Sequence, residues 1–123
     1  MQLKSLGVAT VLLAAGCYSV EDVRNTPPSL VATYSGQFDE IANCISAQAS
    51  KNHAVTPQFY QRDRRATVIL AIPTSHTVAE EYEVQQITDT TSRVTWRNAF
   101  VQSPGPNSGR PARQLMERCA TPA

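Results

Sequence analysis

The sequence carries almost no net charge, and this limits the partners that it can recognise by charge. Its 123 residues include 11 Lys and Arg and 10 Asp and Glu, for a formal charge of +1. A nearly neutral chain lacks the basic surface with which proteins bind nucleic acids. Hydrophobic residues make up 41% of the chain, which suits the core of one small domain. We therefore expect a single domain and no nucleic-acid partner.

The motifs of common metal and catalytic sites are also missing. The two histidines, His53 and His76, lack a second histidine at metal-binding spacing. Ser75 adjoins His76, but no Gly-x-Ser-x-Gly turn presents a serine nucleophile. We therefore expect both histidines on the surface, and neither a metal, a cofactor nor a catalytic centre.

Two acidic clusters resemble the paired carboxylates of glycoside hydrolases, but each has a simpler structural explanation. Asp39 and Glu40 stand at the start of an expected helix, where the helix dipole favours negative charge. Glu80, Glu81 and Glu83 belong to the expected polar face of a strand. An enzyme acting on the cell wall is therefore the least favoured of the functions considered.

The N-terminal segment is apolar but too short to cross a membrane. Lys4 is followed by eleven residues without a charge, Leu6 to Gly16, whereas a transmembrane helix needs about twenty apolar residues. A short basic start and an apolar run of this length are typical of an export signal. A buried N-terminal helix is the alternative, but the run is apolar on all sides rather than along one stripe.

The end of this segment, LLAAGCYS at residues 12–19, resembles the lipobox of bacterial lipoproteins. In that motif a leucine and two small residues precede a cysteine; here two small residues precede Cys17, and Ala14 stands where leucine is commonest. The resemblance implies that residues 1–16 are a lipoprotein signal peptide and that Cys17 is the lipidation site, which would carry palmitate or related acyl chains. Cleavage by the ordinary signal peptidase, without lipid, is the alternative.

The same resemblance predicts in which membrane the protein is anchored. In the sorting rule of enteric bacteria, aspartate after the lipidated cysteine retains the protein in the inner membrane, and here that position is Tyr18. We therefore expect a lipid anchor in the outer membrane, with the protein on the periplasmic side. The inner membrane and the soluble periplasm are the alternatives.

The cysteine count agrees with the lipobox. The chain has three cysteines, and because a disulfide uses two, one cysteine of an exported protein would remain without a partner. If Cys17 carries lipid, Cys44 and Cys119 remain to form a disulfide in an oxidising periplasm. Residues 17–29, which are mostly polar and include Pro27-Pro28, are expected to form an acylated tether. Residues 30–123 then form one small periplasmic domain.

Two amphipathic helices are expected. In residues 37–52, five apolar positions recur at spacings of three and four and form one stripe, and Ser35 is expected to cap the helix. Residues 103–110 contain prolines and glycines and predict a loop. Pro111 then suits a first helical turn, and the closing helix places Cys119 on its apolar face. The apolar positions are Phe38, Ile41, Ala42, Ile45 and Ala49 in the first helix, and Ala112, Leu115 and Met116 in the second.

The middle of the chain predicts strands. Residues 66–72 are rich in β-branched side chains and suit a central strand. Residues 81–87 and 93–100 alternate between apolar and polar side chains, as strands with one buried face do. Shorter extended segments are expected at residues 30–34 and 59–61, and Tyr82 and Trp96 are expected in the core.

The register of the hairpin between these two alternating strands follows from matching their buried faces. Val84 must oppose an even-numbered residue such as Val94 or Trp96. This requires a three- or five-residue loop, or a bulge, and brings Glu81 or Glu83 beside Arg97.

Arg62, Arg64 and Arg65, with Asp63 between them, form the most basic patch of the sequence. Guanidinium groups bind phosphates, lipid headgroups and acidic proteins, so this is a candidate partner or anion patch. A solvated turn between strands is the alternative.

Together these patterns predict an α+β fold with an antiparallel sheet of about four strands, and with two helices on one face joined by Cys44 and Cys119. A small open barrel with peripheral helices is the alternative fold. For function we expect a non-catalytic, membrane-anchored lipoprotein of the cell envelope, acting as an adaptor or accessory subunit for an envelope protein whose identity the sequence does not give. The alternative is a periplasmic module that binds a ligand or inhibits an enzyme.

Overall fold

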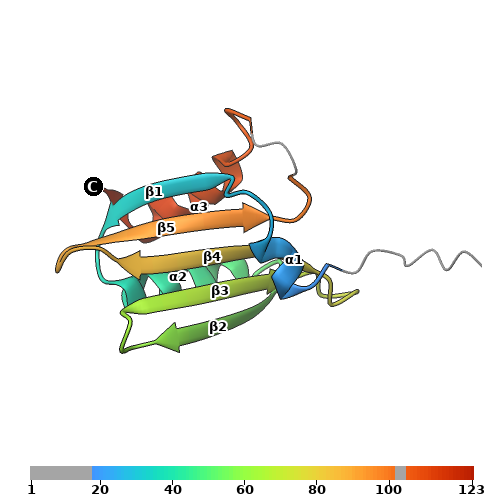
Figure 1. The fold of residues 1–123 in the computed structure, drawn as a ribbon, viewed down its shortest axis with the longest axis horizontal. Helices are drawn as coiled ribbons and strands as arrows, with labels where there is room; N and C mark the ends of the chain where they lie inside the picture. The colour runs from blue at the N-terminus through green and yellow to red at the C-terminus, as the bar shows by residue number, and fades with distance from the viewer. Residues whose placement is uncertain (1–17, 102–104) are drawn as a thin grey trace, which may run out of the picture.

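The computed structural model describes residues 18–101 and 105–123, and it shows an α+β fold built on one antiparallel sheet (Figure 1). The sheet has six strands in the order β2-β3-β4-β5-β1-β6. The strands are β1 (Leu30–Ser35), β2 (Ala54–Tyr60), β3 (Arg65–Ala71), β4 (Val78–Gln86), β5 (Thr91–Asn98) and β6 (Thr121–Pro122), and the helices are α1 (Val20–Arg24), α2 (Phe38–Ala49) and α3 (Arg110–Cys119).

Helix α2 forms where its apolar stripe predicts. Its five stripe residues, from Phe38 to Ala49, are all buried against the sheet. Ser35 was expected to cap its N-terminus but does not, because Ser35 is part of strand β1 and pairs with Thr91. Instead the Phe38 N–H donates to the side-chain oxygen of Gln86 at 2.8 Å. A residue of β4 thus supplies the cap that the local sequence lacks.

Helix α3 packs beside α2 on the same face of the sheet, as Figure 1 shows. Ala112 and Met116 are its buried residues, and Pro111 occupies the first turn. A disulfide joins Cys44 of α2 to Cys119 of α3. The prediction of two disulfide-linked helices on one face is confirmed, and the core lies between these helices and the sheet.

The hairpin between β4 and β5 has the predicted register. Val84 pairs with Val94, and Glu81 pairs with Arg97. The last pair is Gln86 with Ser92, so the five residues 87–91 form the connection. The parity of the buried face thus restricted the partner of Val84 to an even-numbered residue such as Val94 or Trp96, and the structure selects Val94.

The sheet has more strands than the expected four. Strand β2 begins at Ala54 rather than near Phe59, and β6 adds a short pairing to Tyr34 and Ser35 of β1. β2 is an edge strand whose side chains are mostly exposed, so its sequence shows no alternation. An edge also tolerates Pro57, which has no N–H to donate.

Residues 18–29 are packed on the fold, in contrast to the extended tether expected for 17–29. Helix α1 begins with a capping box in which Ser19 and Asp22 bond to each other's backbone N–H. Its Val23 is completely buried. The helix lies across β4 and β5 on the face opposite α2 and α3 (Figure 1). The described part of the chain therefore has three helices rather than the two expected, and the additional one lies on the other face of the sheet.

The expected signal peptide, residues 1–16, and the expected lipidation site, Cys17, lie outside the described residues, as do residues 102–104 of the loop before α3. Within the described part, no helix is both long enough and apolar enough to cross a bilayer.

Candidate functional site

A cleft of about 240 Å³ opens between the C-terminal end of α2, the side of α3, and the sheet. Its floor includes Leu70 of β3 and Tyr82 of β4, and Leu115 of α3 forms part of one wall. Lys51 and Arg118 stand at its rim. Apolar and polar side chains therefore share the lining, and small-molecule sites combine both kinds of group.

Glu80 is the most constrained polar group in this cleft. Its Oε1 accepts a hydrogen bond from the indole Nε1 of Trp96 at 2.9 Å, and its Oε2 lies 3.4 Å from Nε2 of His53. The side chain is 15% exposed. Burial raises the pKa of Glu80, while the Trp96 hydrogen bond and the His53 charge act in the opposite direction.

Tyr82 lies on the floor beside Glu80. Burial raises the pKa of its phenol far above the ordinary value, and the nearby Glu80 charge adds to this effect. The hydroxyl therefore stays protonated at physiological pH. The Tyr82 and Trp96 rings are tilted against each other with centroids 6.4 Å apart, so both aromatic residues belong to the core, as expected.

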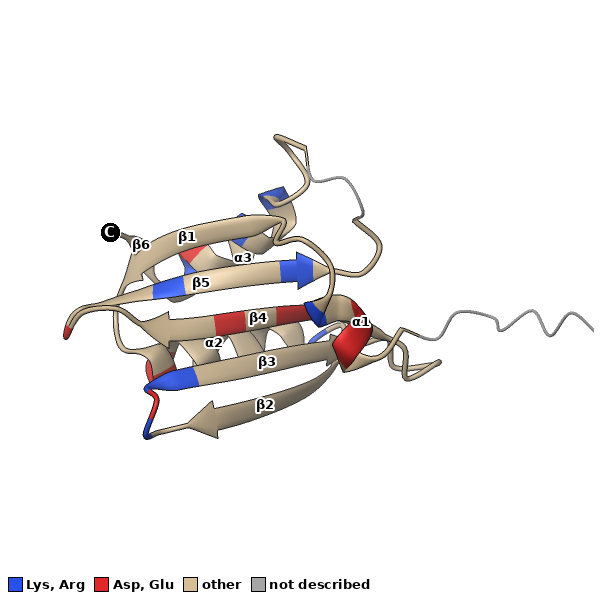
Figure 2. Cartoon of the chain, in the orientation of Figure 1, with Lys and Arg blue, Asp and Glu red and all other residues tan. Residues whose placement is uncertain are grey.

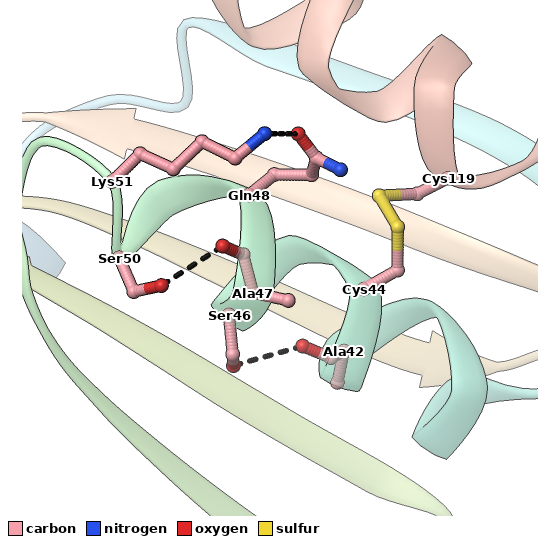
Figure 3. Close-up of a disulfide and its surroundings, with 8 residues drawn as sticks. All are labelled: Ala42, Cys44, Ser46, Ala47, Gln48, Ser50, Lys51 and Cys119. Carbon is pink, nitrogen blue, oxygen red and sulfur yellow. Dashed lines mark hydrogen bonds between the residues drawn. A yellow bond between two sulfur atoms is a disulfide. The ribbon is translucent and has the colours of Figure 1, made fainter.

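The disulfide positions the α3 wall of the cleft. Cys44 and Cys119 have Cα atoms 5.6 Å apart although 75 positions separate them in the sequence. Figure 3 shows the sulfur bridge between the two helices, and Lys51 donating to Gln48 on the turn of α2 that borders the cleft. The cysteines thus contribute to the site by holding its two helices together.

The structure places the three arginines at one end of the sheet and pairs two of them with acids (Figure 2). Arg64 lies 3.5 Å from Asp89 of the neighbouring hairpin, and Arg65 lies 3.6 Å from Glu83. The Arg65 guanidinium also stacks over the ring of Tyr60 at 4.3 Å. Arg62 is exposed and has no ion pair among the described residues. Much of the expected positive charge is therefore balanced locally.

The histidines have different environments. His76 is exposed in the turn between β3 and β4, as predicted. His53 is half-buried, because it directly precedes β2 and the pairing of β2, β3 and β4 brings it beside Glu80. His53 is 31% exposed, so it is at the surface only in part, and its contact with Glu80 was not predicted. The two residues are 27 positions apart, which explains why no local motif reveals the contact.

Two of the clustered glutamates are also more buried than expected. Glu80 and Glu81 point to opposite faces of β4, so they do not form a carboxylate pair. Glu81 was expected on a polar face, but α1 covers it and leaves it 2% exposed. Its Oε2 accepts from Arg24 Nε at 2.8 Å. The charge on Glu81 is thereby compensated by the helix that buries it.

The cleft offers charged and hydrogen-bonding side chains, such as those of Lys51, Glu80 and Arg118, with which a bound molecule can pair. In residues 18–101 and 105–123, no group of three or more His, Cys, Asp or Glu side chains is placed to hold a metal ion. Both cysteines of this part are oxidised in the disulfide. In comparisons with known proteins, the sequence matches no family model, and no curated protein matches it significantly.

Proposed function

We propose that the protein is a non-catalytic lipoprotein of the bacterial cell envelope, anchored through Cys17 and acting as an adaptor or accessory subunit. The main support for this proposal is the role of each of the three cysteines. The sequence has three cysteines, and two of them form the disulfide between α2 and α3. The remaining one, Cys17, is the cysteine of the lipobox-like stretch. Disulfides persist in oxidising compartments such as the periplasm, which agrees with export.

The outer membrane is the proposed location, with the domain facing the periplasm. Tyr18, rather than aspartate, follows the proposed lipidated cysteine. Two or more acyl chains give a stable anchor, because each buried methylene contributes about 0.8 kcal/mol to membrane binding. Fractionation of envelopes on a density gradient tests the location, and recovery with inner-membrane markers would exclude it.

Two surfaces support an adaptor role. On the sheet face opposite α2 and α3, Val31 is 55% exposed and Thr33 and Arg93 are also exposed. At one end of the sheet, the turn between β2 and β3 presents Arg62 without an ion pair in the described part of the chain. Both surfaces offer polar groups that a protein partner can pair with.

Metabolic labelling with an alkyne fatty acid tests the anchor. The parent protein should incorporate the label, and Cys17→Ser should lose it because the acylated thiol is gone. The double variant Cys44→Ala/Cys119→Ala should keep it, which controls for acylation of other cysteines. Label retained by Cys17→Ser would rule out the proposed anchor.

Crosslinking in intact envelopes followed by co-purification tests the adaptor role. We expect one discrete envelope protein to co-purify with the acylated parent. The triple change of Arg62, Arg64 and Arg65 to alanine should reduce its recovery if the arginine turn is the contact, whereas Arg93→Ala should reduce it if the sheet face is used. Equal recovery of the partner from the parent and from all variants would show that neither surface contacts it.

The cleft between α2 and α3 favours a second candidate function, the binding of a small molecule. Its apolar walls and the cations Lys51 and Arg118 suit a compact apolar ligand with an anionic group. The dye 1-anilinonaphthalene-8-sulfonate has this chemistry and serves as the probe. Leu115→Trp, which fills the cleft, should abolish its fluorescence enhancement, while Val31→Trp on the far face should not. A parent protein that does not enhance the dye would count against this function.

A further inference from the structure

We propose that the acylated domain rests directly on the bilayer through one end of its sheet, with Phe100 in the headgroup layer. We call this region the membrane-facing end and define it by Tyr18 and residues 72–77 and 98–101. The inference rests on the proposed acylation of Cys17. It adds an orientation and a second membrane contact, neither of which the lipobox-like stretch implies.

The first observation is that Tyr18, the residue after Cys17, is held firmly against the fold. The backbone oxygen of Tyr18 accepts a hydrogen bond from Val78 N–H at 3.0 Å, and its ring lies edge-on to Phe100 with centroids 5.2 Å apart. Cys17 is the next residue, so its Cα lies about 3.8 Å from that of Tyr18. Acyl chains on Cys17 would therefore enter the bilayer immediately beside this end of the sheet.

The second observation is the composition of the membrane-facing end. Residues 72–77 and 98–101 contain no Lys, Arg, Asp or Glu. Phe100 is 56% exposed and is the most exposed large apolar side chain of the described residues. Exposed aromatic rings are favourable at a membrane interface, and these two segments bring no charge into it, where burying charge is costly.

At the opposite end of the sheet, by contrast, the connecting segments themselves carry charges. There the turn between β2 and β3 carries Arg62, Asp63 and Arg64, and the hairpin between β4 and β5 carries Asp89 (Figure 2). Strand β5 separates the two ends by eight residues, or about 26 Å at 3.3 Å per residue. The proposed orientation therefore holds the arginine turn well clear of the headgroups, where a protein partner can reach it.

The charges near the membrane-facing end indicate which lipid surface fits. Glu21 and Asp22 are exposed in the first turn of α1, directly after Tyr18 and Ser19. Carboxylates are repelled by an anionic leaflet, whose surface attracts basic segments instead. Arg24 in the last turn of α1 and Lys51 just before β2 add positive charges near the same end, so the charges there are mixed in sign. A surface of mixed charge fits a zwitterionic headgroup layer, which we take as its occupant.

Quenching of tryptophan fluorescence by brominated acyl chains tests the orientation. Full-length protein, acylated in the cell, is reconstituted into phosphatidylcholine vesicles with and without brominated lipid. Phe100→Trp places a probe at the membrane-facing end. Ile87→Trp is the matched control, because Ile87 is 48% exposed at the opposite end of the sheet. The natural Trp96 is 3% exposed and supplies the same background in both variants.

We expect brominated lipid to remove roughly half or more of the emission that Phe100→Trp adds, and little of that from Ile87→Trp, because aromatic side chains at this depth reach the upper acyl chains. Equal quenching of the two variants, or none, would overturn the orientation. The intact mass of each sample shows separately whether Cys17 is acylated. An acylated protein without selective quenching refutes this inference alone, whereas a protein without lipid refutes the proposed function and the inference together.

Discussion

Gln86 joins three separate backbone segments through one buried side chain. Its Oε1 accepts from Phe38 N–H, and its Nε2 donates to the carbonyls of Thr88 and Thr91 at 2.7 and 3.1 Å. The start of α2 and the connection between β4 and β5 are thus tied to the end of β4. A buried amide whose donors and acceptor are all used resists substitution, because its partners would be left unpaired.

Replacing Gln86 by leucine should therefore lower the free energy of unfolding by about 1–3 kcal/mol, since buried backbone groups lose their partners. Urea denaturation followed by circular dichroism measures this change. Gln61→Leu, at an exposed position in the turn between β2 and β3, is the matched control and should be nearly neutral. Equal stability of the two variants would show that the side chain is not a significant cap.

Glu80 makes stability depend on pH. Because burial raises its pKa in the folded protein above the ordinary 4.5, folding disfavours the ionised form. The folded state then binds more protons than the unfolded state, and stability falls as the pH rises above about 4.5. Glu80→Gln keeps an oxygen for Trp96 but cannot ionise, so it escapes this loss.

Between pH 4 and pH 7, the free energy of unfolding of Glu80→Gln should therefore increase relative to that of the parent. Denaturation curves at several pH values measure it, and Glu40→Gln, exposed on α2, should show no comparable trend. A difference that moved in favour of the parent over this range would mean that the His53 and Trp96 contacts outweigh burial.

At the scale of elements, α1 is the least expected part of the fold. It has five residues, and Val23 is its single buried side chain. What it adds is a cover for Glu81, whose carboxylate is paired with Arg24, and a backbone contact in which Arg97 Nε donates to Thr26 O at 3.2 Å. Residues 18–29 are therefore part of the folded domain.

Arg24→Ala should lower the free energy of unfolding by about 1–3 kcal/mol, because it leaves the buried Glu81 carboxylate without its partner. The lower end of the range applies if water reaches the site, since the Arg24 side chain is 45% exposed. Arg93→Ala on the same sheet face is the control, because Arg93 is exposed and has no ion pair in the described residues. Similar losses in both variants would contradict this role for α1.

At the scale of the whole molecule, the disulfide links two helices that lie far apart in the sequence. Cys44 follows the first strand and Cys119 closes the last helix. The bridge therefore restricts most of the unfolded chain of the domain. It also fixes the position of α3, which is joined to β5 through residues 99–109.

The variant Cys44→Ala/Cys119→Ala should lose about 4 kcal/mol of unfolding free energy, the chain-entropy value for closing a loop of this length. That is a large part of the roughly 5–15 kcal/mol that stabilises small domains. Thermal denaturation of the parent with and without reductant gives an independent measure. Unchanged stability in both experiments would show that α2 and α3 pack equally well without the bridge.

Features that depend on a regular spacing of apolar side chains, or on the number of cysteines, were predictable from the sequence. The stripe of α2 gave one buried face, and the alternation in β4 and β5 restricted the partner of Val84 to residues such as Val94 and Trp96, of which the structure has Val94. Features without a period were not predictable. Strand β2 is exposed along both faces, and α1 buries one residue only, so neither leaves a pattern that distinguishes it from a loop.

The sequence by itself determined the two amphipathic helices and the parity of the central hairpin, because each depends on spacing, and it predicted the pairing of Cys44 with Cys119 on the condition that Cys17 carries lipid. Only the tertiary structure decided that Glu80 meets His53, that Gln86 caps α2, and that α1 covers Glu81. These contacts join residues that are 27, 48 and 57 positions apart. Strand order and helix placement bring them together, and neither is encoded in the local pattern of side chains.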